Sequence, residues 1–123
     1  MGIVSVLDIS RRCEYTRTMT DTTLRQQRCL FTALIAKLIT ECNVYRSYEL
    51  ALAPTREHMP NSLHYIGLAQ DIDLYIDGVY QKDSAAHQWI GARWKSMHPL
   101  CRWGGDFAKP DGNHYSMEWQ GVK

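Results

Sequence analysis

The stretch SLHYIGLAQDIDLY, residues 62–75, places one histidine and two aspartates in an otherwise largely apolar run. Burying a charged side chain is costly unless it is paired or bound to a metal. His64 and Asp71 are seven residues apart, so on a continuous helix they would lie roughly 10.5 Å apart along the axis. On a continuous strand this odd spacing would put them on opposite faces. The chain must therefore turn between them, and Gly67 is the residue that permits the turn.

Two segments alternate between polar and apolar residues, as strands with one buried face do. They are DIDLYI (71–76) and HYSMEW (114–119). Their polar faces carry Asp71 and Asp73 in the first segment and His114, Ser116 and Glu118 in the second. If the two strands pair, we expect His114 and Asp71 to converge on the polar side of the sheet.

Two imidazoles and one carboxylate at one vertex make a three-ligand zinc site with an open fourth position, which is typical of catalytic zinc. We therefore predict one Zn²⁺ held by His64, Asp71 and His114. Asp111 stands three residues before His114 in DGNH, where its carboxylate could accept a proton from water activated by the metal. The alternative for His64 and Asp71 alone is a hydrogen-bonded core pair without a metal. The other histidines stand in loop or helix-end positions and are expected at the surface, namely His58, His87 and His98.

Two helices are expected elsewhere in the chain. The clearer one begins at the N-cap Asp21, carries apolar residues at helical spacing from Leu24 to Cys42, and is closed by Asn43. A second helix is expected over about residues 84–97.

The remaining segments predict strands and turns. YELALA (48–53) is expected to be a strand, DG at 77–78 a tight hairpin turn, and WGGDFAKPDGN (103–113) a glycine-rich loop. Residues 1–19 support no clear assignment. Helices with a few strands and no βαβ rhythm predict an α+β domain, a small antiparallel sheet flanked by helices.

Composition narrows the class of protein. A chain of 123 residues is expected to form one domain over 1–123, and 45% hydrophobic with 22% charged residues is ordinary for a globular protein. A net charge of +1 and the lack of a long apolar run give no reason to expect a nucleic-acid or membrane partner. The N-terminal residues do not have the order of a signal peptide. We expect a monomer whose four cysteines, which form no CxxC pair, are reduced.

Two motifs resemble a known enzyme family. SLHYIGLAQD matches the pattern S-x-H-x-x-G-x-A-x-D, and DGNH matches a downstream acidic-x-x-His element. Together they resemble the M15 zinc peptidases, the group of D-Ala-D-Ala carboxypeptidases and L-Ala-D-Glu endopeptidases. Residues 94–119 resemble more narrowly the small phage and prophage endolysin-like members. The resemblance covers roughly residues 25–121 and implies a Hedgehog/DD-peptidase-like fold.

The resemblance also implies roles for single residues. His64, Asp71 and His114 would be the zinc ligands, and Asp111 the catalytic acid/base. An arginine upstream of the first motif would bind a substrate oxygen. Arg56 and Arg46 are both candidates, and Arg56 is favoured because it follows a predicted strand. Ser62 would support the site through its hydroxyl. Apart from the resemblance, Trp103 precedes a Gly-Gly turn and could form a wall of a substrate groove.

The activity implied is hydrolysis of stem peptides in bacterial peptidoglycan. An L-alanyl-D-glutamate endopeptidase of an endolysin is the leading expectation, and a D-alanyl-D-alanine carboxypeptidase uses the same chemistry. A non-catalytic zinc module that binds cell-wall peptide is the alternative of another class. Without a signal peptide, such an enzyme would be made in the cytoplasm of the host bacterium and act in the periplasm or cell wall after release.

Overall fold

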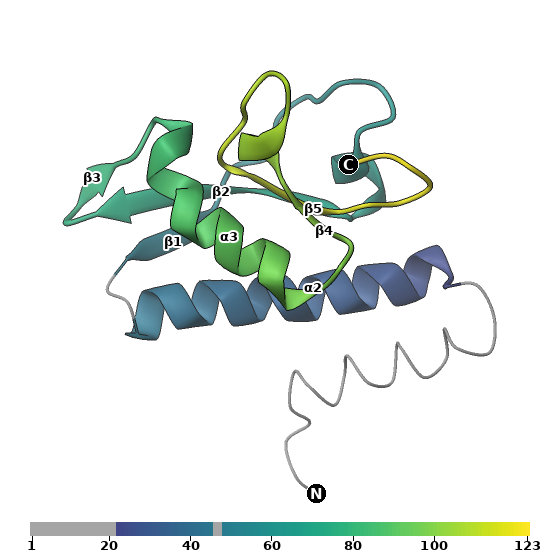
Figure 1. Ribbon diagram of the computed structural model, residues 1–123, viewed down its shortest axis with the longest axis horizontal. Helices are drawn as coiled ribbons and strands as arrows, with labels where there is room; N and C mark the ends of the chain where they lie inside the picture. The colour runs from purple at the N-terminus through teal and green to yellow at the C-terminus, as the bar shows by residue number, and fades with distance from the viewer. Residues whose placement is uncertain (1–21, 46–47) are drawn as a thin grey trace, which may run out of the picture.

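The computed structural model describes residues 22–45 and 48–123. In this part of the chain an open antiparallel sheet of five strands packs against two α-helices, α2 and α3 (Figure 1). The predicted α+β class is therefore confirmed. No helix in the same part is long and apolar enough to cross a lipid bilayer.

The first helix, α2 (Leu24–Thr40), begins with a capping box. The Thr23 hydroxyl accepts a hydrogen bond from the Gln26 backbone N–H at 3.2 Å, and the Gln26 side chain accepts one from the Thr23 N–H at 2.9 Å. The cap is thus Thr23, whereas the predicted cap, Asp21, lies outside the described residues.

A short π-helical turn, η1 (Glu41–Tyr45), extends this helix, so Asn43 does not close it in a left-handed conformation. The Asn43 side chain instead donates to the Leu50 carbonyl at 3.0 Å and accepts from the Leu50 N–H at 2.6 Å. The end of the helix is thereby tied to the first strand of the sheet.

The strands run in the order β1-β2-β5-β4, with β3 paired to β2. Their bounds are β1 (Glu49–Leu52), β2 (Ala69–Ile76), β3 (Val79–Tyr80), β4 (Cys101–Trp103) and β5 (His114–Met117). The three predicted strands are confirmed, and so is the hairpin, because Asp77 and Gly78 have φ angles of 51° and 76°. Strand β4 was not predicted, since it is short and adjoins the glycine-rich loop.

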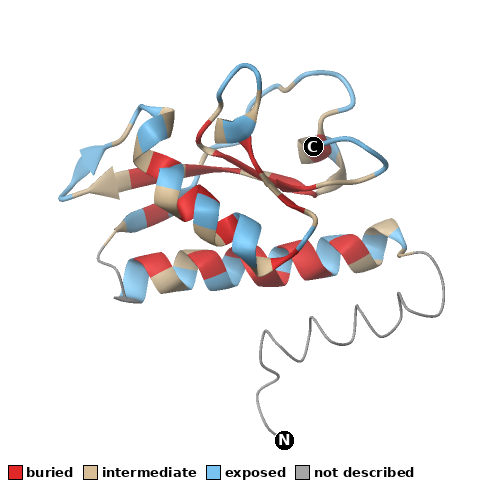
Figure 2. Ribbon diagram, viewed as in Figure 1, coloured by how far each residue is buried: buried red, intermediate tan, exposed pale blue. Residues whose placement is uncertain are grey.

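Helix α3 (Gln88–Met97) and the 3₁₀ turn before it, η3 (Ser84–His87), fill the range predicted for the second helix. Trp94 of α3 joins the layers: its ring lies 5.8 Å from that of Phe31 on α2 and 6.4 Å from that of Tyr115 on β5. Both helices therefore cover one face of the sheet, where buried residues gather (Figure 2). The opposite face of β2 and β5 is left for polar side chains.

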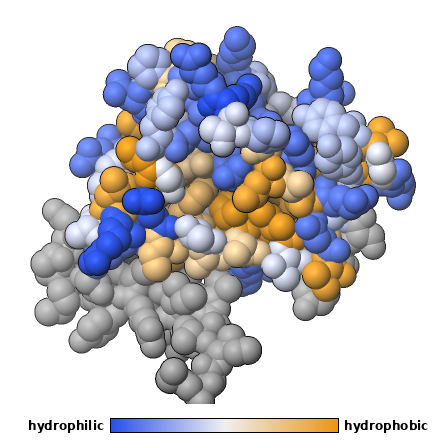
Figure 3. Space-filling view, turned by 180° about the vertical axis from the view of Figure 1, so that it is seen from behind, coloured by the Kyte–Doolittle hydropathy of each residue, from blue (hydrophilic) through white to orange (hydrophobic). Residues whose placement is uncertain are grey.

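The reverse side of the molecule is chemically mixed, with hydrophobic residues toward its middle and hydrophilic residues around them (Figure 3). Among the described residues, the large apolar side chains that stay exposed are Val44, Leu52, Met59, Tyr65, Val79, Tyr80 and Val122. Exposed apolar side chains of this kind are common on folded domains.

Two histidines expected at the surface, His87 and His98, are buried, and His87 is only 2% exposed. The His87 Nδ1 atom lies 2.8 Å from the hydroxyl oxygen of Tyr115. Burial lowers the pKa of His87, and the opposing attraction of Asp73 and Asp111 is smaller. His87 therefore belongs to the core as a neutral, hydrogen-bonded side chain.

This burial predicts a loss of stability in acid. In the unfolded chain His87 should titrate near its ordinary pKa of about 6.5. The contribution of neutral His87 to the free energy of unfolding should be fully present above that pH. It should decline as the pH falls toward the lower pKa of the folded state, because the unfolded state then takes up a proton that the folded state does not. Urea unfolding of the metal-free protein at about pH 7.5 and about pH 5 should show this decline. The variant His87→Gln should show a smaller difference, and an unchanged difference would contradict the assignment.

Candidate metal centre

His64 is presented by a short 3₁₀ turn, η2 (Leu63–Ile66), at the entrance to β2. Ser62 caps this turn, since its Oγ accepts a hydrogen bond from the His64 N–H at 3.2 Å. Gly67 ends the turn with a φ of 76°, a left-handed conformation that favours glycine. The predicted turn between His64 and Asp71 is thus confirmed, and Ser62 acts on the backbone of His64.

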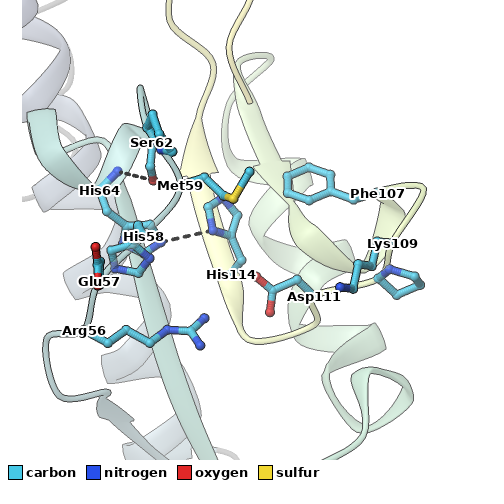
Figure 4. Close-up of a pocket in the computed structure, with 12 residues that line it drawn as sticks. Arg56, Glu57, His58, Met59, Ser62, His64, Phe107, Lys109, Asp111 and His114 are labelled. Atoms are coloured by element: carbon cyan, nitrogen blue, oxygen red, sulfur yellow. Dashed lines mark hydrogen bonds between the residues drawn. The ribbon is translucent and has the colours of Figure 1, made fainter.

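Asp71 and His114 are direct cross-strand partners in the antiparallel pair of β2 and β5. Side chains paired in this way lie on the same face of the sheet. The His64 Nε2 atom reaches both of them, at 3.2 Å from His114 Nδ1 and 3.3 Å from Asp71 Oδ1. The third distance, from His114 Nδ1 to Asp71 Oδ1, is 3.8 Å. The structure thus brings together the three side chains that the sequence predicted as ligands. Figure 4 shows two of them, His64 and His114, with their rings close together.

These distances fit a zinc site. Zinc bonds of about 2.0–2.1 Å in a tetrahedron separate neighbouring ligand atoms by about 3.3–3.4 Å. The Asp71 Oδ1 atom is buried and has no hydrogen-bond partner among the described residues, although His64 Nε2 lies 3.3 Å away. A buried carboxylate oxygen without a donor is an unfavourable arrangement that a cation would relieve.

The charge states of Asp71 and His114 also suit a cation. Burial works to raise the pKa of Asp71, but His64, Arg56 and His114 together lower it below its ordinary value. Burial lowers the pKa of His114, and His64 lowers it further. The carboxylate therefore stays ionised and the imidazole neutral, which are the forms that bind metal.

Asp111 lies beside this cluster and is held there through its backbone. Its N–H donates to the Gly104 carbonyl at 2.9 Å, and its carbonyl accepts from the His114 N–H at 3.1 Å. One carboxylate oxygen of Asp111 lies within 4.8 Å of ligand atoms of Asp71 and His114. This is close enough for Asp111 to exchange a proton with a molecule bound at the centre, directly or through one water.

The neighbouring Gly112 fixes the same loop from two sides. Its N–H donates to Ser84 Oγ at 2.9 Å, and its carbonyl accepts from Trp103 Nε1 at 2.7 Å. Trp103 is 7% exposed and is not among the residues that line the cleft beside the metal centre. The expectation that Trp103 walls a substrate groove is therefore corrected: this side chain supports the Asp111 loop from the core.

Gly112 should not tolerate a side chain. A Cβ atom placed there would lie 2.4 Å from Ser84 Cα, so Gly112→Ala must displace the loop. We expect a loss of about 1–3 kcal/mol in the free energy of unfolding, as in other overpacked sites. Gly78→Ala is the matched control for a glycine substitution away from this loop. Its added Cβ would meet nothing within 4 Å, so the φ of 76° in the hairpin is the source of strain there. If Gly112→Ala matches the wild type in urea unfolding, this view of the loop is wrong.

Arg56 approaches the metal centre from the side opposite Asp111 (Figure 4). Its Nε lies 3.3 Å from Asp71 Oδ2, while its side chain remains 61% exposed. No further hydrogen bond from this guanidinium is found within the described residues. The structure thus places Arg56 at the site, whereas the alternative, Arg46, lies outside the described residues.

An open cleft of about 760 Å³ lies over the cluster. His64 and His114 form its floor, the segment from Arg56 to Ser62 forms one wall, and the segment from Phe107 to Asp111 forms the other (Figure 4). A peptide-sized ligand could therefore reach His64, His114 and Asp111 together.

His58 is a member of the site that sequence reasoning missed, since it was expected at the surface. Its ring stacks on that of His64, with centroids 3.6 Å apart and planes inclined by 2°. The ligand atoms of His58, His64 and Asp71 lie within 4.8 Å of one another. His58 occupies an irregular loop, where no periodicity indicates which way a side chain points.

Comparisons with known proteins assign no family to this chain. A scan against family models finds no match to the chain, and a search of curated proteins finds none either. The M15 resemblance of the two motifs therefore remains a prediction.

Proposed function

We propose that this chain is a zinc-dependent peptidase that cleaves stem peptides of bacterial peptidoglycan, with L-alanyl-D-glutamate endopeptidase as its leading activity. The observation that carries the proposal is the convergence of His64, Asp71 and His114 under an open cleft, with Asp111 beside them. The motif resemblance supports the choice of peptidoglycan among peptide substrates.

His64, Asp71 and His114 would hold Zn²⁺, which when bound lowers the pKa of water to about 7 and polarises a carbonyl group. Asp111 would accept a proton from the attacking water and deliver it to the leaving amine. Arg56 uses its Nε to contact Asp71, which leaves its Nη atoms to hold a substrate oxygen. The Asp111 carboxylate and the Arg56 guanidinium would thus act from opposite sides of the cleft.

The walls of the cleft offer cationic groups for a peptide carboxylate and apolar surface for small side chains, while Glu57 and Asp111 add negative charge to the same walls. Arg56 and Lys109 supply positive charge, and Met59 and Phe107 supply apolar surface close to His114 (Figure 4). An alanyl-glutamate junction offers a methyl group and a carboxylate in adjacent residues, which suits both features. The enzyme would be made in the host cytoplasm and reach the wall after release, and it would act as a monomer.

A D-alanyl-D-alanine carboxypeptidase is the second candidate, and the free Nη atoms of Arg56 favour it, because such an enzyme must grip a terminal carboxylate. Mass spectrometry of purified muropeptides after incubation with the zinc-loaded protein separates the candidates. Cleavage between L-alanine and D-glutamate is expected. Release of D-alanine alone would point to the carboxypeptidase, and bound zinc without any cleavage would point to a binding module. A chain that neither binds zinc nor cleaves would overturn the proposal.

A further inference from the structure

No described residue forms a hydrogen bond with the second ring nitrogen of His64, Nδ1. A metal-binding histidine normally donates its second ring N–H to a carboxylate, a carbonyl or a water, and this bond fixes the orientation of the ring. Within the part of the chain that the structure describes, the only hydrogen-bond contact of the His64 ring is through Nε2, with His114. The final torsion of a histidine side chain is broad, so a ring held by Nε2 alone could turn away from the site.

His58 occupies the place where that support is needed. Its ring lies face to face with that of His64, 3.6 Å away and inclined by only 2°. A second ring lying flat on the first blocks rotation of His64 about its final torsion on that side. The side-chain nitrogens of His58 form no hydrogen bond with any described residue, so stacking is the contact that the structure assigns to this ring.

His58 is itself held by the residue that follows His64. The Tyr65 hydroxyl accepts a hydrogen bond from the His58 N–H at 2.8 Å and donates one to the His58 carbonyl at 2.9 Å. The Tyr65 ring also meets the His58 ring edge-on, with centroids 5.9 Å apart. The loop that carries His58 is thereby fastened to the same 3₁₀ turn that carries His64.

The stacked geometry argues against His58 as a fourth ligand of the same ion. The lone pair of an imidazole nitrogen lies in the plane of its ring, so a bound ion also lies near that plane. Because the planes of His58 and His64 are nearly parallel and their centroids are 3.6 Å apart, an ion in the plane of His64 is out of the plane of His58.

We propose that His58, fastened by Tyr65, is a positioning residue that holds the His64 imidazole in its metal-binding orientation by stacking. The proposal rests on the metal site of the proposed function, but it concerns a contact that exists with or without the ion. It predicts that the flat face of residue 58 matters and that its nitrogens do not.

The affinity of the metal-free protein for Zn²⁺, measured by competition with a chromophoric chelator, tests this prediction. His58→Ala should weaken binding on the order of 10-fold to 100-fold, the usual effect of losing a supporting contact. His58→Phe keeps a flat ring and should bind nearly as well as the wild type. The Co²⁺ absorption spectrum should be altered in His58→Ala and preserved in His58→Phe. Tyr65→Phe should weaken binding to a smaller extent, and Tyr80→Phe, which removes a tyrosine hydroxyl on the exposed hairpin, should not.

Two outcomes would overturn the proposal. Unchanged affinity in His58→Ala would show that the stack does not position His64, and a His58→Phe variant as weak as His58→Ala would make His58 a direct ligand.

Proton NMR of the metal-free protein gives a readout independent of zinc and of catalysis. The ring protons of His64 should be shifted upfield in the wild type and in His58→Phe, but not in His58→Ala. If the wild type binds no zinc, the proposed function fails while this NMR comparison still decides whether the stack orients His64.

Discussion

Replacing Asp111 by alanine is expected to lower kcat on muropeptides on the order of 10²-fold to 10⁴-fold, the range typical of losing a general acid/base. The variant should still bind one zinc ion, because His64, Asp71 and His114 supply three ligand atoms within 3.8 Å of one another without it. Hydrolysis rates measured by chromatography, together with metal content after dialysis, would separate the two effects.

Two further variants sharpen the assignment of Asp111. Asp111→Glu keeps a carboxylate on a longer arm and should recover part of the activity. Asp106→Ala removes a carboxylate from the same segment, but one that is exposed and paired with Lys95 at 2.7 Å, so activity should be unaffected. Near-normal cleavage by Asp111→Ala would refute the proton-transfer role. Loss of zinc from that variant would instead make Asp111 a ligand, which its distance of less than 4.8 Å from Asp71 and His114 ligand atoms permits.

The sequence was most informative where short-range geometry leaves few choices. The spacing of seven positions from His64 to Asp71 excludes a continuous helix or strand that brings both to one site. Gly67 was predicted as the turn, and the structure confirms this with a φ of 76°. The period of two along a strand likewise predicted that Asp71 and His114 share a face, and they are direct cross-strand partners. Local spacing and strand register thus brought together the candidate metal ligands.

Residues whose positions depend on the packing of distant segments could not be predicted in this way. His58 and His87 stand in a loop and at a helix start, positions that usually lie at the surface, yet one stacks on His64 and the other packs beside Tyr115. Trp103 beside two glycines suggested a groove, whereas its indole N–H is needed by the Gly112 carbonyl in the core. Each of these positions is decided by a partner far away in the sequence or by an irregular backbone, neither of which leaves a periodic pattern.

Replacing Asp71 by asparagine should have the largest effect on metal binding. Asparagine keeps the shape of the side chain but removes the negative charge of a residue that contacts His64, His114 and Arg56. Zinc affinity should fall by more than the roughly 100-fold that the loss of an outer supporting partner can cause. Asp73→Asn is the matched control, since it lies two residues further along β2, pairs with Ala51 of β1 and belongs to neither candidate metal group of the described residues.

The stability of the Asp71→Asn variant should depend on whether zinc is present. A ligand that binds only the folded state adds RT ln(1 + L/Kd), where L is the free ligand concentration, to the free energy of unfolding, so excess zinc should raise the unfolding temperature of the wild type and of Asp73→Asn. Asp71→Asn should lose most of this zinc-dependent increase. Without zinc, Asp71→Asn should unfold at a temperature close to that of the wild type. The ion pair of Asp71 with Arg56 contributes little net stability, because the Arg56 side chain is 61% exposed and the cost of burying the Asp71 charge offsets much of the attraction. Thermal unfolding with chelator and with excess zinc measures both quantities. An equal zinc-dependent increase in Asp71→Asn and the wild type would mean that the metal does not bind at this carboxylate.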